Sequence, residues 1–173
     1  MPKILDFLRK IFGEKKRSLP KSEIDYSAHD PEALQRLLER INRQGDLRDW
    51  AIPRPLVTLE EFFEGNSDYS SIGYNLIPPP SPQEFYDLFR SIREKSEVFD
   101  VRVQVNGQEE SESWPWSDTI WIITSAEAEE VEHWLGERFQ ADAPLTIGFE
   151  QDCRKLEKYQ LPEGMNAIGV WWD

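Results

Sequence analysis

A chain of 173 residues with a single cysteine and a formal net charge of −13 is long enough for one packed domain and cannot form an intrachain disulfide. No apolar stretch approaches the roughly 20 residues that a transmembrane helix needs, and charged side chains interrupt the apolar N-terminal stretch where a secretory signal would lie. Together with the lone thiol, these features predict a cytoplasmic protein.

The charge is divided unevenly along the chain. Residues 1–22 carry seven basic and two acidic side chains, whereas residues 23–173 carry 13 basic and 31 acidic ones, which gives net charges of +5 and −18. We therefore expect a basic segment at 1–22 and a single acidic domain at 23–173. An acidic body repels phosphate backbones, so nucleic-acid binding is disfavoured and a charged partner should be basic. The alternative is that the acidity serves solubility alone.

Residues 3–12 have the spacing of a short amphipathic helix, followed by a charged linker. An apolar side with a cationic rim suits an interfacial helix, so weak contact with an anionic membrane surface is one expectation. Docking on a partner and folding back on the acidic body are the alternatives. The candidate membrane-surface residues are Ile4, Leu8, Lys10, Ile11 and Phe12.

Two helices are predicted in the first half of the acidic domain. The first has Asp30 as its cap, Pro31 in its first turn, an apolar stripe at helical spacing and Gly45 at its end. The second is short and opens with the capping-box pair Thr58 and Glu61. The apolar side chains on these helices that must be buried are Leu34, Leu37, Leu38, Ile41, Phe62 and Phe63.

From residue 71 onward, strands and helices alternate. The apolar run 72–77 predicts a short strand, although Gly73 weakens the pattern. Ser81 and Glu84 form another capping box, and apolar residues follow it at helical spacing. Residues 99–105 alternate between apolar and polar side chains, which is typical of a half-buried strand.

The most apolar strand is predicted at 118–124. Its residues are apolar in succession, so it should be buried on both faces and lie inside a sheet. Thr124 or Ser125 is expected to cap the helix that follows, and the alternation of residues 167–172 predicts a last strand.

This order of elements, β-α-β-β-α-β, predicts an α+β fold of the ferredoxin-like (split βαβ) type, with two helices on one face of a four-stranded antiparallel sheet. Neighbouring residues of a strand point to opposite faces, so Trp171 or Trp172 must lie on the face away from these helices. Either residues 24–65 cover that face as a third layer, or it stays open for a partner or a second copy.

No residue pattern of a catalytic, metal or cofactor site is present. Glu130 and His133 would lie on one helix face, but a di-metal centre needs a second such pair, so we expect His133 to be a surface side chain. Cys153 has basic neighbours but no histidine base nearby in sequence. The nine glycines are scattered singly, which excludes a phosphate-binding loop. We therefore expect no cofactor, no metal and no catalytic set.

Tryptophan is the more informative residue type, because the chain has seven. Trp114-Pro115-Trp116 lies just before the buried strand, in a connection that we expect at the surface, and exposed tryptophans are frequent binding anchors. An aromatic sheet face resembles an RNA-stacking platform, but no basic residues interleave with these rings. The candidate partner-binding residues are Trp114, Trp116, Asp118 and Trp171.

Four segments of the chain resemble a family of small uncharacterised bacterial proteins of about this length. They read PRPLVTLEEFFEGN (53–66), SIGYNL (71–76), WSDT (116–119) and VWWD (170–173). The resemblance covers residues 53–173 and leaves the N-terminal helix as an extension. It implies no activity and supplies no catalytic residues.

Three functional hypotheses follow. The first is a non-enzymatic interaction protein that binds a protein partner; neutralisation of a basic toxin, as bacterial immunity proteins achieve it, is one form of this hypothesis. The second is a membrane-peripheral protein recruited by residues 3–12. The third is an enzyme whose carboxylates are scattered along the chain. The acidic domain, the Trp-Pro-Trp loop and the lack of a catalytic set favour the first.

Overall fold

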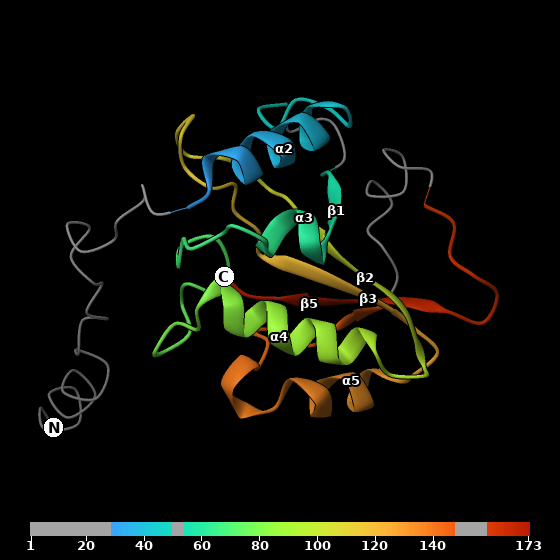
Figure 1. Cartoon of the computed structure of the whole chain (residues 1–173). Helices are drawn as coiled ribbons and strands as arrows, with labels where there is room; N and C mark the ends of the chain where they lie inside the picture. The colour runs from blue at the N-terminus through green and yellow to red at the C-terminus, as the bar shows by residue number, and fades with distance from the viewer. Residues whose placement is uncertain (1–28, 50–53, 148–158) are drawn as a thin grey trace, which may run out of the picture.

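The computed structural model describes residues 29–49, 54–147 and 159–173 (Figure 1). The predictions for residues 1–22, including the membrane-surface candidates, and for Cys153 lie outside these ranges. The described helices are α2 (Pro31–Asn42), α3 (Leu59–Phe63), α4 (Pro82–Arg93) and α5 (Ala128–Leu135), with a 3₁₀ turn η2 (Glu137–Phe139). The described strands are β1 (Leu56–Thr58), β2 (Val98–Gln104), β3 (Thr119–Thr124), β4 (Thr146–Ile147) and β5 (Asn166–Trp171).

The strands form one antiparallel sheet in the order β1-β2-β3-β5-β4, which confirms the α+β class. All six residues of β3 are buried, and the strand lies at the centre of the sheet, as its apolar pattern predicts. Ile120 pairs with Val103 on one side and with Val170 on the other. The two short outer strands, β1 and β4, are additions to the predicted sheet.

The predicted strand at 72–77 is wrong, and the ferredoxin-like connectivity that depends on it is not present. This segment forms turns, because Gly73 has a φ of +58° in the left-handed region, which a strand does not contain. A Cβ at Gly73 would clash with Cζ of Phe85, so the loop packs closely against α4. β5 occupies the position beside β3 that the predicted strand would have filled.

The four helices lie on one side of the sheet, which we call the first face (Figure 1). This confirms the placement of α4 and α5 but contradicts a third layer built from residues 24–65, since the described part of that segment packs into the same core. α3 follows β1 directly and turns onto this face, where the rings of Phe63 and Tyr86 stack at 5.8 Å. On the opposite side, the second face, Tyr159, Leu161 and Met165 pack against a small buried cluster instead.

Three of the predicted helix caps are confirmed. The side chains of Asp30, Thr58 and Ser81 each accept a hydrogen bond from the first turn of their helix. The predicted cap of α5 is wrong: this helix begins after Glu127 without a side-chain cap. The hydroxyl of Thr124 instead donates to the carbonyl oxygen of Glu97 and accepts from the backbone N–H of Ala126.

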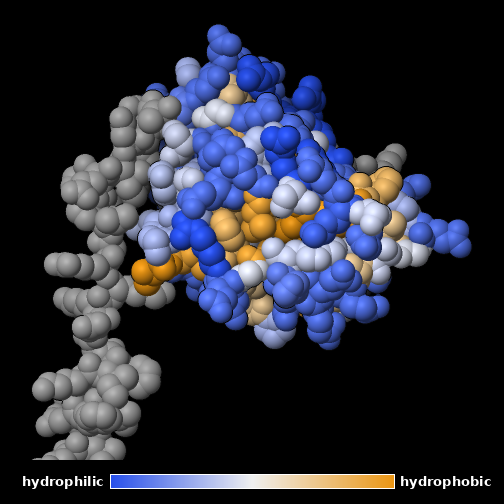
Figure 2. Space-filling model, turned by 60° about the horizontal axis from the view of Figure 1, so that its bottom comes forward, coloured by the Kyte–Doolittle hydropathy of each residue, from blue (hydrophilic) through white to orange (hydrophobic). Residues whose placement is uncertain are grey.

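The outer surface of the molecule on the side of α4 and α5 is mostly hydrophilic, with a limited apolar band across it (Figure 2). Among the described residues, the large apolar side chains that remain exposed are Tyr69, Tyr74, Ile77, Phe99 and Trp171. None of the described helices combines the length and the apolar character that crossing a bilayer requires.

Candidate functional site

The connection between β2 and β3 contains the Trp-Pro-Trp sequence and folds back at the end of the sheet. The backbone N–H of Asn106 donates to the carbonyl of Trp116 (2.9 Å), and the N–H of Trp116 donates to the carbonyl of Gly107 (2.8 Å). The indole of Trp116 lies against Gly107, where a Cβ would come within 2.7 Å of its Nε1. Glycine at position 107 therefore permits the close approach that fixes this ring.

A second loop, residues 66–74, lies beside the Trp-Pro-Trp connection. Its turn is held by Asn66, whose side chain accepts from the N–H of Asp68 (2.9 Å) and donates to the hydroxyl of Ser71 (2.9 Å). The N–H of Ser117 donates to the carbonyl of Ser71 (2.8 Å), which joins the two loops. The end of β5 joins them as well, because the N–H of Trp172 donates to the carbonyl of Asp118 (2.9 Å).

A cavity of about 300 Å³ lies where these three segments meet. The rings of Trp114 and Trp172 are buried, Trp116 is half-buried, and Tyr74 is exposed. The volume is at the lower end of the range for ligand pockets, which is enough for a side chain or a small molecule. We call it the tryptophan cavity; it is lined by Asp68, Ser70, Ile72, Gly73, Tyr74, Glu109, Ser113, Trp114, Trp116, Ser117, Asp118, Trp172 and Asp173.

Every charged side chain that lines the tryptophan cavity in the described part of the chain is acidic. These side chains are Asp68, Glu109, Asp118 and Asp173, and no described lysine, arginine or histidine lines the cavity. No ion pair engages any of these four carboxylates within the described part of the chain. Asp68 is buried at 3% exposure, whereas Glu109 and Asp173 are exposed. The arrangement favours a cationic ligand.

The structure places the four predicted partner-binding residues in different settings. Trp116 and Asp118 line the tryptophan cavity. Trp114 also lines it, but its ring is buried and its Nε1–H donates to the carbonyl of Phe62 (3.0 Å). The rings of Trp114 and His29 meet in an edge-to-face arrangement, with 5.7 Å between their centroids. The prediction of Trp114 as a surface anchor is therefore corrected: this ring is an inner wall of the cavity.

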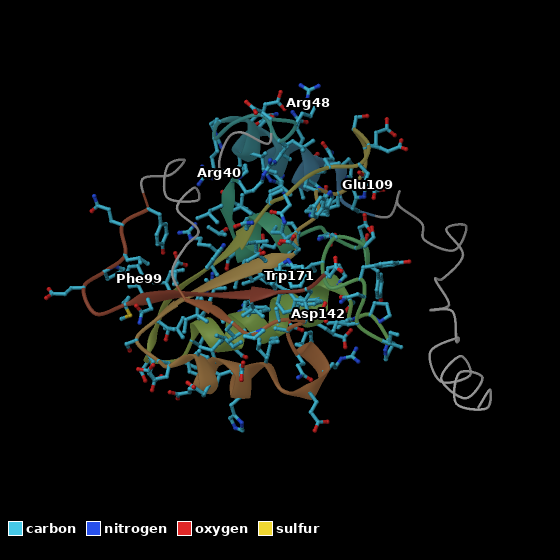
Figure 3. The ribbon with its side chains drawn as sticks, turned by 180° about the vertical axis from the view of Figure 1, so that it is seen from behind. Arg40, Arg48, Phe99, Glu109, Asp142 and Trp171 are labelled. Atoms are coloured by element: carbon cyan, nitrogen blue, oxygen red, sulfur yellow. The ribbon has the colours of Figure 1, made fainter. Side chains whose placement is uncertain are left out.

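Trp171 lies apart from the other three. It projects from the second face of the sheet, where it is 37% exposed and pairs in register with Thr119 (Figure 3). Its neighbour Trp172 points to the first face instead, packs against the edges of Phe85 and Phe89, and borders the cavity. The alternation of the strand thus sends the two indoles to opposite sides of the sheet.

Sequence reasoning missed the other charged residues of the cavity, Asp68, Glu109 and Asp173, and its two other aromatic residues, Tyr74 and Trp172. Single carboxylates carry no signal in a chain with 33 acidic residues. A local signal did exist at the second loop, since the alternation of Asn66, Asp68 and Ser70 is typical of Asx turns. It indicates an ordered loop but not what that loop faces.

His133 lies exposed on α5 and borders a hollow of about 730 Å³ together with Glu132, Glu137 and Asp142. Over residues 29–49, 54–147 and 159–173, no three side chains of His, Cys, Asp or Glu come together as a set of metal ligands. The carboxylates of the tryptophan cavity therefore line its wall without converging on one point.

A tyrosine with a shifted pKa, Tyr159, lies on the second face of the sheet. The hydroxyl of Tyr159 donates to Oδ2 of Asp100 (2.7 Å), and Nε of Arg102 donates to the same oxygen (2.7 Å). Burial, followed by the hydrogen bond to Asp100, raises the pKa of Tyr159 well above its usual range. The phenol stays neutral and helps to hold residues 159–165 against the sheet.

Comparison with known proteins identifies a family that matches this chain. Residues 32–170 match the family model described as "Uncharacterized protein YfbO family". The chain belongs to the YfbO family. A YfbO relative from Escherichia coli (strain K12), described as an uncharacterized protein, is 37% identical over 140 residues, which cover 81% of this chain and 98% of the relative. No solved structure matches the chain.

The YfbO match confirms the resemblance to small uncharacterised bacterial proteins. It begins after the basic segment 1–22 and includes both loops of the tryptophan cavity. The family description assigns no activity.

Proposed function

We propose that this YfbO-family protein is a non-enzymatic interaction protein that binds a basic protein partner at the tryptophan cavity. The observation that carries the proposal is the composition of the cavity wall, where the described residues contribute four carboxylates, four aromatic rings and no basic side chain. Carboxylates attract a cation through charge, and indole and phenol rings attract it through their quadrupole. A basic side chain of a partner meets both requirements.

The overall charge supports the same proposal. A domain with a net charge of −18 attracts basic proteins over a distance of about 10 Å at moderate salt and accelerates their encounter. A cytoplasmic location and, as one form of the partner, a basic toxin belong to this proposal. A stable complex needs roughly 800 Å² of contact on each partner, so the cavity would be the anchor of a wider interface.

The proposed contact surface differs from the one that the sequence predicts. Trp116 and Asp118 remain in it, Tyr74 and Glu109 join it at the exposed rim, and Trp171 lies on the other face of the sheet. Phe99 accompanies Trp171 on that side and is 58% exposed (Figure 3). The two aromatic regions are therefore separate surfaces.

Affinity capture with a charge-reversal variant tests the proposal. The immobilised full chain is exposed to lysate of the native bacterium at low salt, in parallel with Glu109→Lys and with Glu129→Lys as the matched control. Glu129 is exposed on α5 and lies outside the cavity lining, so both variants change the net charge equally. We expect the wild type and Glu129→Lys to retain a protein of high isoelectric point, and Glu109→Lys to lose it.

Two further results would contradict the proposal. One is the retention of no basic protein by the wild type. The other is an equal loss of the partner in both charge variants, which would show that binding follows net charge rather than the cavity.

A further inference from the structure

Asp68 is the most deeply buried charged residue of the tryptophan cavity, with only 3% of its surface exposed. Its Oδ1 accepts two hydrogen bonds from Ser70, one from the backbone N–H (2.8 Å) and one from the hydroxyl (2.6 Å). Neither bond engages Oδ2, and no cation of the described residues pairs with Asp68. Oδ2 is not among the buried atoms that lack a hydrogen-bond partner, so it keeps some contact with solvent and can accept from a donor that enters the cavity.

The aromatic rings that line the cavity with Asp68 favour a guanidinium over an ammonium. Trp116 is half-buried, and its Nε1–H donates no hydrogen bond within the described part of the chain. Tyr74 adds a second ring, 43% exposed. A guanidinium is planar, weakly hydrated and stacks on such rings, whereas an ammonium is a compact and strongly hydrated charge.

The cavity also offers more than one carboxylate oxygen, which favours a group with several donors. Asp118 lines the same cavity, and its Oδ1 accepts from the hydroxyl of Thr119 (2.6 Å) while its Oδ2 makes no hydrogen bond among the described residues. Asp68 and Asp118 thus offer one oxygen each. A guanidinium carries five N–H donors in a fixed fork and can serve more than one acceptor.

We propose that the tryptophan cavity binds the guanidinium group of one arginine side chain supplied by the protein partner. Asp68 is the inner ion-pair acceptor, Trp116 and Tyr74 are the flanking rings, and Glu109 stands at the entrance. The cavity volume of about 300 Å³ suits one side chain. This inference rests on the proposed function, because the arginine belongs to the basic partner.

The direct test uses blocked pentapeptides that differ only in a central arginine, lysine or citrulline. Each is titrated into the full chain while the indole Nε1–H resonance of Trp116, assigned by its loss in Trp116→Phe, is followed by NMR. We expect saturable shifts with arginine, weaker binding by about threefold or more with lysine, and no saturable shift with citrulline, which keeps the shape but lacks the charge. Equal binding of arginine and citrulline would overturn the inference.

A charge-neutral variant of Asp68 makes the test specific to the inner acceptor. Asp68→Asn keeps an oxygen that can accept from Ser70, and we expect it to weaken the arginine peptide about tenfold. Asp87→Asn, which removes the same charge at an exposed position of α4, should leave the affinity unchanged. Unchanged binding in Asp68→Asn would contradict the assignment. If circular dichroism shows that Asp68→Asn does not fold, Glu109→Gln at the exposed rim replaces it, with an expected weakening of about two- to threefold.

Free arginine distinguishes a protein partner from a small metabolite. If free arginine binds more tightly than the blocked peptide, the cavity is a site for the free amino acid and the partner assignment is overturned. The failures of the two proposals remain distinguishable: capture of a basic protein that depends on Glu109 without arginine selectivity overturns only this inference. Arginine selectivity without any captured basic protein overturns the proposed function.

Discussion

The two faces of the sheet are built on the same strands but are stabilised in different ways. The first face and its four helices bury one continuous core that includes Phe62, Phe85, Phe89 and Trp172. The buried apolar cluster of the second face, in the described residues, is limited to Leu56, Trp121, Ile123 and Ala167. Tyr159 and the charged pair of Asp100 and Arg102 lie beside it. We infer that the first face specifies the fold, whereas the second depends on a few close contacts and polar interactions.

The largest difference between the faces should appear when one phenyl ring is removed from each. Phe85 is fully buried and meets the rings of Phe139 and Trp172 edge-on at 5.0 and 5.4 Å. Phe85→Ala should lower the free energy of unfolding by about 3–5 kcal/mol, since it removes buried surface and leaves a cavity. Phe99→Ala on the second face, where the ring is 58% exposed, should lower it by less than about 1 kcal/mol.

Urea denaturation followed by tryptophan fluorescence measures both values. If both variants lost the same free energy of unfolding, the inferred difference between the two faces would be contradicted.

An intermediate effect is expected at Gly169, where the second face is tightly packed. A Cβ at Gly169 would lie 2.7 Å from Cζ3 of Trp121, closer than real Cβ contacts allow. Gly169→Ala should therefore destabilise the protein by about 1–3 kcal/mol, although alanine is otherwise favoured over glycine inside a strand. Thermal or urea unfolding of the variant measures the change.

A double-mutant cycle sharpens this prediction. In Trp121→Phe the larger indole is replaced by a smaller ring, so Gly169→Ala should cost at least about 0.5 kcal/mol less in that background. If the two changes are additive, the second face is less closely packed at this point than the structure indicates.

Much of the fold could be predicted because most elements have clear periodic patterns. The helical stripe of α2, the capping boxes of α3 and α4, and the apolar run of β3 all lie where the sequence predicts them. β1 and β4 have three and two residues, which is too short for a period to be recognised. In the loop at 72–77, Ile72 and Gly73 are buried and Gly73 lies against Phe85, whereas Ile77 is 84% exposed. An apolar run in the sequence does not distinguish such a loop from a strand.

The candidate site was predictable only in part. The Trp-Pro-Trp sequence drew attention to the correct loop, and Trp116 and Asp118 do line the cavity. The sequence could not show which indole turns inward, because the acceptor for Trp114 is the carbonyl of Phe62, 52 residues earlier in the chain. Asp68 could not be singled out for a related reason: its significance comes from its burial in the wall of the cavity, which depends on tertiary structure.

A smaller effect is expected from the hydrogen bond between Tyr159 and Asp100 on the second face. Tyr159→Phe removes the hydrogen bond to Asp100 and should lower stability at neutral pH by about 1 kcal/mol. The folded protein holds the phenolic proton because the pKa of Tyr159 is raised, whereas the unfolded chain releases it near the ordinary value of 10.0. Stability from this group is therefore fully present below pH 10.0 and is lost as the pH rises above it.

Unfolding measured between neutral and strongly alkaline pH tests this sign. Stability of the wild type should decline more steeply above pH 10.0 than that of Tyr159→Phe. Parallel declines would show that Tyr159 titrates alike in both states and does not close the second face.

The smallest effect is expected at the rim of the first face, where Arg93 of α4 bonds to Glu60 of α3 at 2.5 and 3.0 Å. The hydrogen bond from Arg93 is the main reason that the pKa of Glu60 is lowered from 4.5. Because the Glu60 side chain is 39% exposed, solvent screening limits the contribution of the pair to less than about 1 kcal/mol. This stability is present above pH 4.5 and is lost as the pH falls through the lowered pKa.

Glu60→Gln should therefore be slightly less stable than the wild type at neutral pH and should approach it in acid, as urea unfolding at several pH values will show. Glu129→Gln, at an exposed position of α5, serves as the control and should match the wild type throughout. If the faces differ as we infer, the loss of stability in acid stays small, because Arg93 and Glu60 lie at the rim of the first face and outside its buried core. A loss of several kcal/mol in Glu60→Gln would mean that the helices of the first face depend on charge as much as on buried rings, and the contrast between the two faces would no longer hold.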